Sequence, residues 1–418
     1  MSVLLRTTQR IVASNAADGK LGSIELNLLL AQLVGLPLLG LKQETHSQRI
    51  WVSLNGACVL FALFWYLLFE MYDLCLNFQD VDRITQNLVL TLTHLVYFMK
   101  IVNIWYHYGG LKDIVHRLRV ITRACVLSAK QMETFHKAEM EGKLVMLMYF
   151  NLVLLPGVIG IVSILLFPAD FAGSRFPYTA SLPNFLPPIL QHLYMGLSVA
   201  LLALAITTID CLNELLMNQI CMHLKVLNLA FDELYVTPDK KLRVDPYNWL
   251  LSIVKYHCEL IELRQQVEHI FKLPVMMQFV SSVVIVAMTA FQVIVGDGSK
   301  SSIIMDLLLC CVLCQLFLYC WFGNEVYEQV SIFFSCLNIC ISVGYLIAQS
   351  KTLSTSGFGC SWHDFDGKCK KILLIFMINA ERPFLFTAGG FMGLTLHSFT
   401  YIMSKSYSIV AVLRQMYS

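Results

Sequence analysis

The side chains of this sequence that could take part in catalysis do not form a known catalytic motif. The sequence contains no G-x-S-x-G, no phosphate-binding Walker loop and no H-E-x-x-H motif. Most of its 14 cysteines lie in or beside apolar runs, and Cys311 and Cys314 form a C-x-x-C without histidine or acidic residues around it. We therefore expect these thiols to pack between helices, and we expect neither an enzyme nor a chain that needs a metal or cofactor.

A few polar residues interrupt the apolar runs. Lys100 and His94 share one run; we expect the Lys100 ammonium to extend toward the nearer membrane surface, and His94 to be either a packed polar residue or a ligand donor. Asp306 is expected at an interface with water. Glu70 and Asp73, at the end of the first apolar run, are expected to be solvated.

The elements that position these residues are transmembrane helices. Of 418 residues 57% are hydrophobic and 14% charged, against about 25% charged in soluble proteins, and a net charge of +2 gives no reason to expect nucleic acid. The sequence predicts an all-α, seven-transmembrane protein, with an interfacial or re-entrant helix at Ile24–Leu41. The predicted spans are Trp51–Leu74, Ile84–Tyr106, Leu144–Phe167, Leu186–Ile209, Pro274–Val295, Ile303–Phe322 and one within Phe384–Leu413.

The distribution of positive charge predicts the orientation. With these spans, 24 of the 30 Lys and Arg residues fall on the side of the N-terminus. Cytoplasmic segments of membrane proteins are enriched in Lys and Arg, so we expect a cytoplasmic N-terminus and, after seven crossings, an extracellular C-terminus. This orientation is opposite to that of a G-protein-coupled receptor.

Two stretches between the spans are helical rather than loop-like. Helical apolar spacing continues from the fourth span to Tyr235, and Asp245-Pro246 is a plausible start for a second long helix that runs down to Pro274. Such amphipathic extensions need partner helices, so we expect a cytoplasmic helical anchor domain. The resulting organisation is 1–209 with spans one to four, 210–273 in the anchor, 274–322 with spans five and six, 323–383 in the anchor, and 384–418 with the last span.

The outer halves of spans two to six are candidates for a small-molecule pocket. They combine apolar and aromatic side chains with a few hydroxyl, amide and imidazole groups, which is the usual composition of a ligand site. The alternative is that these residues only pack helix against helix. The candidate ligand-binding residues are Thr91, His94, Gly157, Gly160, Ser163, His192, Tyr194, Met195 and Met305.

The last span is the most polar. Gly389-Gly390-Phe391-Met392-Gly393 is expected to begin it with small residues that allow close helix contact. A helix this rich in Ser, Thr and Lys cannot face lipid all round, so it should line water in a pore shared by several subunits. Val410 and Leu413 could form an apolar constriction near its outer end.

The C-terminal third resembles the insect odorant receptor family, in particular the tuning receptors of mosquitoes. The motifs that carry the resemblance are Cys320-Trp321-Phe322-Gly323-Asn324-Glu325, Cys360-Ser361-Trp362, Arg382-Pro383, Ala388-Gly389-Gly390-Phe391 and Lys405-Ser406-Tyr407-Ser408 with Leu413.

The resemblance implies an odorant-gated, non-selective cation channel in the plasma membrane of olfactory neurons. Its expected partners are a shared co-receptor subunit, in a heterotetramer, a small volatile ligand and membrane lipid. The family's anchor includes a half-helix called 7a, and its pore helix is called 7b. The pore and gate positions would be Tyr407, Val410, Leu413 and Arg414, although Arg414 stands where the co-receptor often has an apolar residue.

One segment departs from the family pattern. After Glu325-Val326-Tyr327-Glu328-Gln329 the family sequence resumes at Ser350, with 20 extra residues between. Val codons begin with GT and one Gln codon is CAG, which are the two ends of an intron. We interpret 330–349 as a retained intron of 60 nucleotides; the alternatives are a genuine elongation of helix 7a or an eighth span.

Three alternative functions follow from other patterns. Ser406-Tyr407 with Gln415 weakly matches the C-terminal motif of gustatory receptors, a channel family of the same superfamily. A G-protein-coupled chemoreceptor would require the opposite orientation, and the sequence has neither a D-R-Y nor an N-P-x-x-Y motif. A secondary transporter would require inverted repeats, which we do not find.

Overall fold

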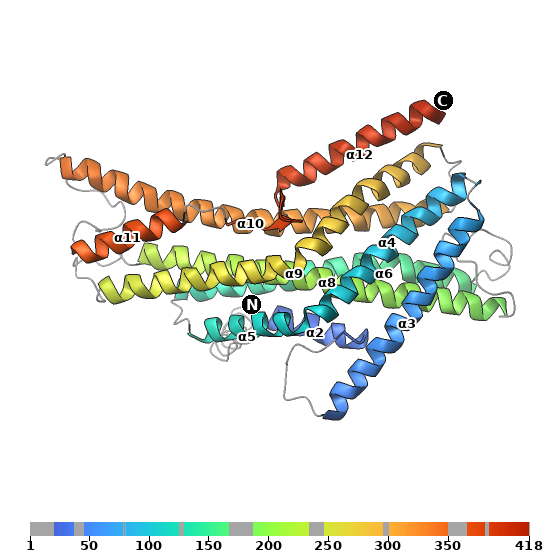
Figure 1. The fold of residues 1–418 in the computed structure, drawn as a ribbon, viewed down its shortest axis with the longest axis horizontal. Helices are drawn as coiled ribbons and strands as arrows, with labels where there is room; N and C mark the ends of the chain where they lie inside the picture. The colour runs from blue at the N-terminus through green and yellow to red at the C-terminus, as the bar shows by residue number, and fades with distance from the viewer. Residues whose placement is uncertain are drawn as a thin grey trace, which may run out of the picture.

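The computed structural model describes residues 21–36, 46–77, 79, 81–124, 129–166, 187–233, 246–295, 301–349, 366–380 and 384–417. The chain is built from long helices and one two-stranded hairpin (Figure 1). The elements are α2 (Gly22–Leu33), α3 (His46–Leu76), α4 (Val81–Tyr106), α5 (Tyr108–Ala124), α6 (Ala129–Leu166), α8 (Pro188–Glu233), α9 (Pro246–Val295), α10 (Ser301–Gln349), α11 (Gly367–Ala380), β1 (Thr387–Ala388), β2 (Met392–Gly393) and α12 (Leu396–Tyr417).

The predicted spans lie in seven of these helices. Within the described residues, α3, α4, α8, α9 and α10 are long and apolar enough to cross a membrane. The third and seventh predicted spans lie in α6 and α12. α8 is one helix of 46 residues, about 69 Å long at about 1.5 Å per residue, more than twice the roughly 30 Å of bilayer hydrocarbon.

Three of the helices are much longer than their predicted spans. α8, α9 and α10 pack against one another and run along most of the long axis of the molecule (Figure 1). α9 begins at Pro246 and contains Pro274, which removes one backbone hydrogen bond, and its course bends between its two parts (Figure 1). α5 and α11 pack beside the part of α9 that precedes this bend.

The segment 330–349 continues α10 as helix. α10 is therefore 49 residues long, and its side chains beyond Ser331 lie outside the described residues.

A buried carboxylate holds the short helix α2 against α6. The first backbone N–H groups of a helix have no partner within the helix. Here the Ser23 N–H donates to Oε2 of Glu139 at 2.9 Å, and the Ser23 hydroxyl donates to Oε1 at 3.1 Å. The amide of Gln219 on α8 donates to the same carboxylate. The helical part of the predicted Ile24–Leu41 segment thus ends at Leu33 and is capped and docked inside the bundle, and residues 37–41 lie outside the described residues.

We expect Glu139→Gln to loosen α2. The amide retains an acceptor oxygen but loses the charge and one acceptor, so the free energy of unfolding should fall by about 1–3 kcal/mol. The measurement is thermal melting of the purified protein in detergent. Glu141→Gln on the exposed face of α6 is the control, and equal melting temperatures for the two variants would contradict the capping role.

Two buried histidines join helices in the part of the chain that is predicted to form the anchor. Nδ1 of His223 on α8 lies 2.7 Å from the Tyr256 hydroxyl on α9, and its Nε2 lies 3.3 Å from the Thr122 hydroxyl on α5. His257 on α9 packs edge-on against the Phe376 ring of α11 at 5.1 Å. Burial lowers the pKa of both imidazoles to about 4, so both are neutral at pH 7.

Both pKa values lie below the value of about 6.5 that histidine has in the unfolded chain. The two neutral histidines therefore stabilise the folded state fully above pH 6.5. The contribution is lost as the pH falls from 6.5 toward 4, since the unfolded chain then binds more protons. The resulting loss in the free energy of unfolding is about 3 kcal/mol per histidine at most.

We expect the melting temperature to drop between pH 7 and pH 5, and we expect the His257→Phe variant to show a weaker dependence on pH. Substitution of the exposed His116 by Gln should leave it unchanged; an identical pH profile for His257→Phe would contradict the assignment.

Candidate functional site

Two carboxylates on α3 are buried against a polar face of α4. Nδ1 of His94 lies 2.8 and 2.7 Å from the two carboxylate oxygens of Glu70, and the Asn87 amide donates to Asp73 at 2.8 Å. The Thr91 hydroxyl donates to the Asn87 side chain at 3.0 Å. The expectation that Glu70 and Asp73 are solvated is wrong, because the last turns of α3 pack on the face of α4 that carries these groups.

An aromatic contact brings α8 to the same place. The Tyr66 ring of α3 lies 5.5 Å from the His94 ring and 6.2 Å from the Tyr194 ring. The Tyr194 hydroxyl donates to the Ala62 carbonyl at 2.9 Å. Next to it, Met195 packs with Leu90 of α4. Four of the predicted ligand residues, Thr91, His94, Tyr194 and Met195, therefore gather where α3, α4 and α8 meet.

The other predicted ligand residues are only partly described. Gly157, Gly160 and Ser163 lie in α6, His192 in α8 and Met305 in α10, and their side chains lie outside the described residues.

An apolar cluster continues from this place toward the last helix. We call it the outer apolar cluster; its buried members are Val89 of α4, Ile285 and Val286 of α9, and Val312 of α10. Met403 of α12 packs against it. A change in the packing of these four side chains is thus transmitted by direct contact to α12.

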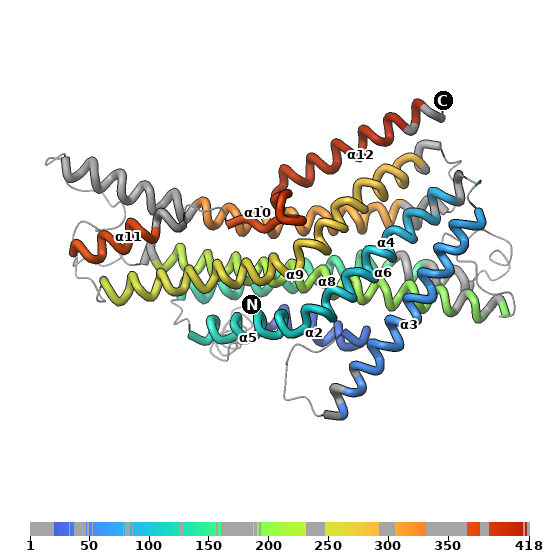
Figure 2. The backbone as a smooth tube through the Cα atoms, viewed as in Figure 1, coloured from blue at the N-terminus to red at the C-terminus, as the bar shows by residue number. Residues whose placement is uncertain are grey.

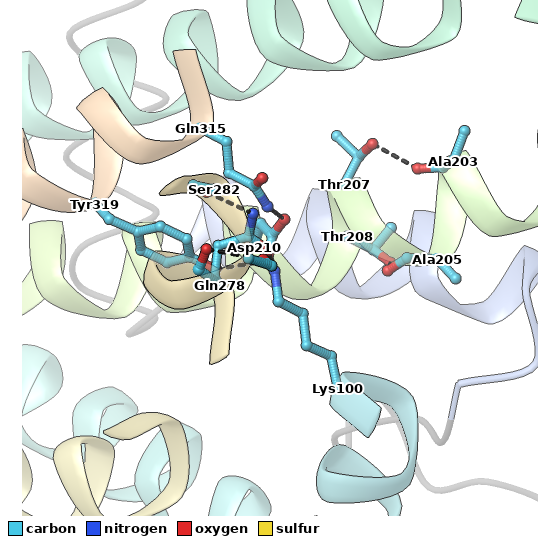
Figure 3. A network of polar contacts seen from close by, with 11 residues as sticks. Lys100, Ala203, Ala205, Thr207, Thr208, Asp210, Gln278, Ser282, Gln315 and Tyr319 are labelled. Atoms are coloured by element: carbon cyan, nitrogen blue, oxygen red, sulfur yellow. Dashed lines mark hydrogen bonds and ion pairs between the residues drawn. The ribbon is translucent and has the colours of Figure 1, made fainter. Parts of the chain in front are cut away.

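A buried ion pair lies deeper in the bundle, near the inner ends of the predicted spans (Figure 3). Nζ of Lys100 on α4 lies 2.8 Å from Oδ1 of Asp210 on α8 and donates to the side-chain carbonyl of Gln278 on α9 at 2.8 Å. The Tyr319 hydroxyl of α10 donates to Oδ1 of Asp210 at 2.6 Å, and the Gln315 amide donates to Oδ2. We call these five residues the inner network.

The inner network corrects the expectation for Lys100. Its side chain is 1% exposed and that of Asp210 is 0% exposed, so the ammonium does not reach the membrane surface. A lone charge buried in this way would cost several kcal/mol, which the ion pair and three further hydrogen bonds offset. The sequence does contain a signal: Lys100 and Asp210 are single opposite charges near the inner ends of two predicted spans.

A β-hairpin precedes α12, where a continuous helix was expected. Thr387 pairs with Gly393 and Ala388 with Met392 in an antiparallel ladder. Gly389 and Gly390 turn the chain with φ of +64° and +84°, a conformation that glycine adopts without a Cβ clash. The expectation that these glycines begin the last helix is therefore wrong, and α12 begins at Leu396.

The hairpin is fastened to α9. Arg264 donates to the Leu385 carbonyl at 2.8 Å and to Glu268 at 2.6 Å, and the Thr387 hydroxyl donates to the same carboxylate. The Gly389 N–H donates to the Lys272 carbonyl at 2.9 Å. The start of α12 is thus fixed to the helix that joins the membrane part to the anchor.

α12 contacts its own chain along a narrow stripe. It runs beside the membrane part of α9 (Figure 2), and its buried residues recur every four positions at Ser398, Ile402, Ser406 and Val410. Its remaining circumference is largely exposed.

The predicted pore residues fall on both sides of this stripe. Tyr407 is 76% exposed and Arg414 is exposed. Val410 packs within the chain, which is not the placement expected of a residue that faces a pore between chains. The Leu413 side chain lies outside the described residues.

Metal chemistry has no support in the part of the chain that the structure describes. It contains no group of three or more His, Cys, Asp or Glu side chains placed to hold an ion, and Cys311 and Cys314 are both free thiols.

Long apolar helices, a buried ion pair and an apolar cluster with few polar groups define a multi-pass helical membrane protein. Over residues 80–335 and 329–407 the sequence matches the family model described as 7tm odorant receptor. The chain belongs to this insect odorant receptor family, whose members sense ligands and are not enzymes.

Individual relatives agree with the family match. The chain is 24% identical to Odorant receptor 85b of Drosophila melanogaster over 253 residues, which are 59% of this chain and 58% of that protein. It is 22% identical to Odorant receptor Or2 of Anopheles gambiae over 169 residues, 40% of this chain and 39% of that one. The alignments thus span about half the length of these relatives.

Solved structures share the fold. The insect olfactory receptor OR5 from Machilis hrabei matches with a TM-score of 0.78 and 17% identity, over 94% of this chain and 97% of that chain. The same receptor in complex with eugenol matches with a TM-score of 0.76. The seven-transmembrane odorant receptor fold predicted from the sequence is confirmed.

Proposed function

We propose that this chain is the odorant-binding subunit of a ligand-gated, non-selective cation channel. The observation that carries the proposal is the contact of the outer apolar cluster with Met403, because it joins the predicted pocket to a helix with an exposed polar face. A volatile ligand that packs better in one arrangement of the cluster favours the matching position of α12. A ligand shifts this equilibrium only by its difference in affinity for the two states.

The ligand is a small volatile molecule, mainly apolar, with one or two polar atoms. The pocket would be lined by the predicted residues Thr91, His94, Gly157, Gly160, Ser163, His192, Tyr194, Met195 and Met305. The eugenol complex of the Machilis receptor, a small aromatic ligand in a chain of the same fold, supports this class of ligand.

The channel would assemble in the plasma membrane as a heterotetramer with a shared co-receptor subunit. Each subunit contributes one α12, and the exposed face with Tyr407 and Arg414 is the one available to line a shared pore. Leu413 remains the proposed constriction. For Val410 to take part, α12 would have to rotate away from its present contact.

The proposal is tested by whole-cell current in cells that express the chain with the co-receptor. We expect a panel of volatiles to evoke a cation current, and Met403→Ala to raise the half-maximal odorant concentration at least about fivefold, a difference of about 1 kcal/mol. Met148→Ala, which truncates an exposed residue of α6, is the control. Absence of any odorant-evoked current despite surface expression would refute the proposal.

The orientation is proposed from charge. The placement of 24 of 30 basic residues supports a cytoplasmic N-terminus. An epitope at the N-terminus should be accessible to antibody only after permeabilisation, whereas labelling of intact cells would restore the G-protein-coupled alternative.

Membership of the odorant receptor family favours an odorant over the taste ligand of a gustatory receptor.

We further propose that 330–349 is a retained intron. The family model matches in two segments, 80–335 and 329–407, that overlap at the start of this stretch instead of forming one continuous match, and this interruption supports the proposal. Amplification of antennal cDNA across the junction should give a main product shorter by 60 nucleotides. A dominant product that keeps them would instead favour the elongated α10.

A further inference from the structure

Two neighbouring helices expose an apolar surface toward the lipid. On α4 the exposed side chains are Leu95, Met99 and Val102. They are four and three residues apart, so they lie on one face of the helix. On α9 they are Leu273 and Val280. These five side chains are 39% to 63% exposed. α4 and α9 pack together, and we call these five side chains the apolar strip.

The strip ends in a basic patch. Tyr106, 84% exposed at the end of α4, marks the membrane boundary, since tyrosines concentrate at the level of the headgroups. Just beyond it, the His107 ring lies edge-on against the exposed His269 ring of α9, with centroids 5.6 Å apart. Lys272, one turn further along α9, is also exposed. Partial burial and the neighbouring His269 lower the pKa of His107, which favours the neutral imidazole, and a neutral imidazole still has one ring N–H to donate to an anion.

Two carboxylates close to this patch along α9 are already engaged. Glu268 accepts hydrogen bonds from Arg264 and Thr387. Glu262, two turns before His269, is paired with Arg117 of α5. The three basic side chains are therefore available to a ligand from the membrane.

We propose that the exposed surface of α4 and α9 binds an anionic glycerophospholipid of the cytoplasmic leaflet. Its phosphate lies at His107, His269 and Lys272, and its acyl chains lie along the apolar strip. A phospholipid fits because the Lys272 ammonium and two imidazole rings that can donate hydrogen bonds lie at the end of an exposed apolar strip, and basic residues at the membrane surface attract anionic headgroups. The cytoplasmic assignment of this boundary rests on the orientation proposed above.

The site would also stabilise the junction of the membrane part with the anchor. The Asn103 amide of α4 donates to the Ile270 carbonyl at 3.0 Å, between His269 and Lys272 along α9. The Lys272 carbonyl in turn accepts the N–H of the hairpin residue Gly389. A lipid at this position therefore holds α4, α9 and the start of α12 together.

Native mass spectrometry of the full chain in detergent tests the proposal, with phosphatidylglycerol and phosphatidylcholine as probes. We expect the wild type to retain phosphatidylglycerol more strongly than phosphatidylcholine. The double variant His269→Gln/Lys272→Gln should bind phosphatidylglycerol about tenfold more weakly, with unchanged phosphatidylcholine binding.

The control variant is His116→Gln/Lys371→Gln, which removes the same side chains from exposed positions on α5 and α11 and should bind like the wild type. Equal retention of both lipids by the wild type would overturn the proposal without any substitution. So would unchanged phosphatidylglycerol binding by the His269/Lys272 variant, or full displacement of the lipid by millimolar inorganic phosphate, which would indicate a site for a free anion.

Discussion

Replacing Lys100 with methionine is expected to destabilise the receptor by about 3–5 kcal/mol, because Asp210 would remain buried without a cation. Methionine retains the volume of the side chain, so the loss reports the charge rather than a cavity. Against a typical stability of about 5–15 kcal/mol, this loss should sharply lower surface expression and melting temperature. Fluorescence-detected size-exclusion chromatography after heating measures both.

The partner substitution separates the ion pair from general damage. Asp210→Asn should also destabilise the protein, but Lys100→Met/Asp210→Asn should cost less than the sum of the two single changes by about 1–3 kcal/mol, because the double variant leaves no unpaired charge. Lys371→Met, at an exposed position on α11, is the control. Strictly additive losses would mean that Lys100 and Asp210 do not stabilise each other.

Replacing Gly323 with alanine should displace the start of α12. A Cβ at this position of α10 would lie 2.5 Å from both the Cβ and the carbonyl oxygen of Leu394, between β2 and α12. The backbone of Leu394 cannot move aside as the end of a flexible side chain can. We therefore expect the variant to lose about 1–3 kcal/mol of stability. We also expect at least a tenfold fall in the odorant-evoked current per receptor at the cell surface.

The same substitution at Gly109 provides a matched control. It lies in α5, where an added Cβ would meet no atom of another element within 4 Å, so Gly109→Ala should be neutral or stabilise the helix by about 0.5–1 kcal/mol. If Gly323→Ala keeps both the wild-type melting temperature and the wild-type current, α12 is not tightly coupled to α10 at this contact.

Helix periodicity in the sequence predicted most of the fold. The apolar spacing from the fourth span to Tyr235 predicted a helix well beyond membrane thickness, and α8 ends at Glu233. Asp245-Pro246 marked the start of α9, which begins at Pro246. These features are local: a turn repeats every 3.6 residues, and a proline suits the first helical position, whatever lies elsewhere in the chain.

The polar contacts inside the bundle could not be read in the same way. Whether Glu70 is solvated or buried depends on which face of α3 meets α4, and that is decided by packing between separate helices. The spacing of Asn87, Thr91 and His94 on one face of α4 was a usable signal, since a polar stripe in an apolar helix needs polar partners. Glu70 and Asp73, three residues apart on α3, are those partners.

The glycines before α12 were misread because small residues have two uses. Between membrane helices they allow close contact, and in a tight turn they allow positive φ. Two consecutive glycines are a typical turn signal, and here they close the hairpin. Composition alone does not decide between these uses, whereas the contact of Gly389 with Lys272 of α9 does.

The cap of α2 has a consequence for biosynthesis. Ser23 is translated 116 residues before Glu139, the carboxylate that its backbone N–H needs. At about 5–20 residues per second, roughly 6 to 23 seconds pass on the ribosome before that partner exists. During this interval the predicted spans in α3 and α4 are made without it. α2 therefore joins the bundle only after α6 has been made, and the N-terminal end of the receptor is among the last parts of its first half to reach its final place.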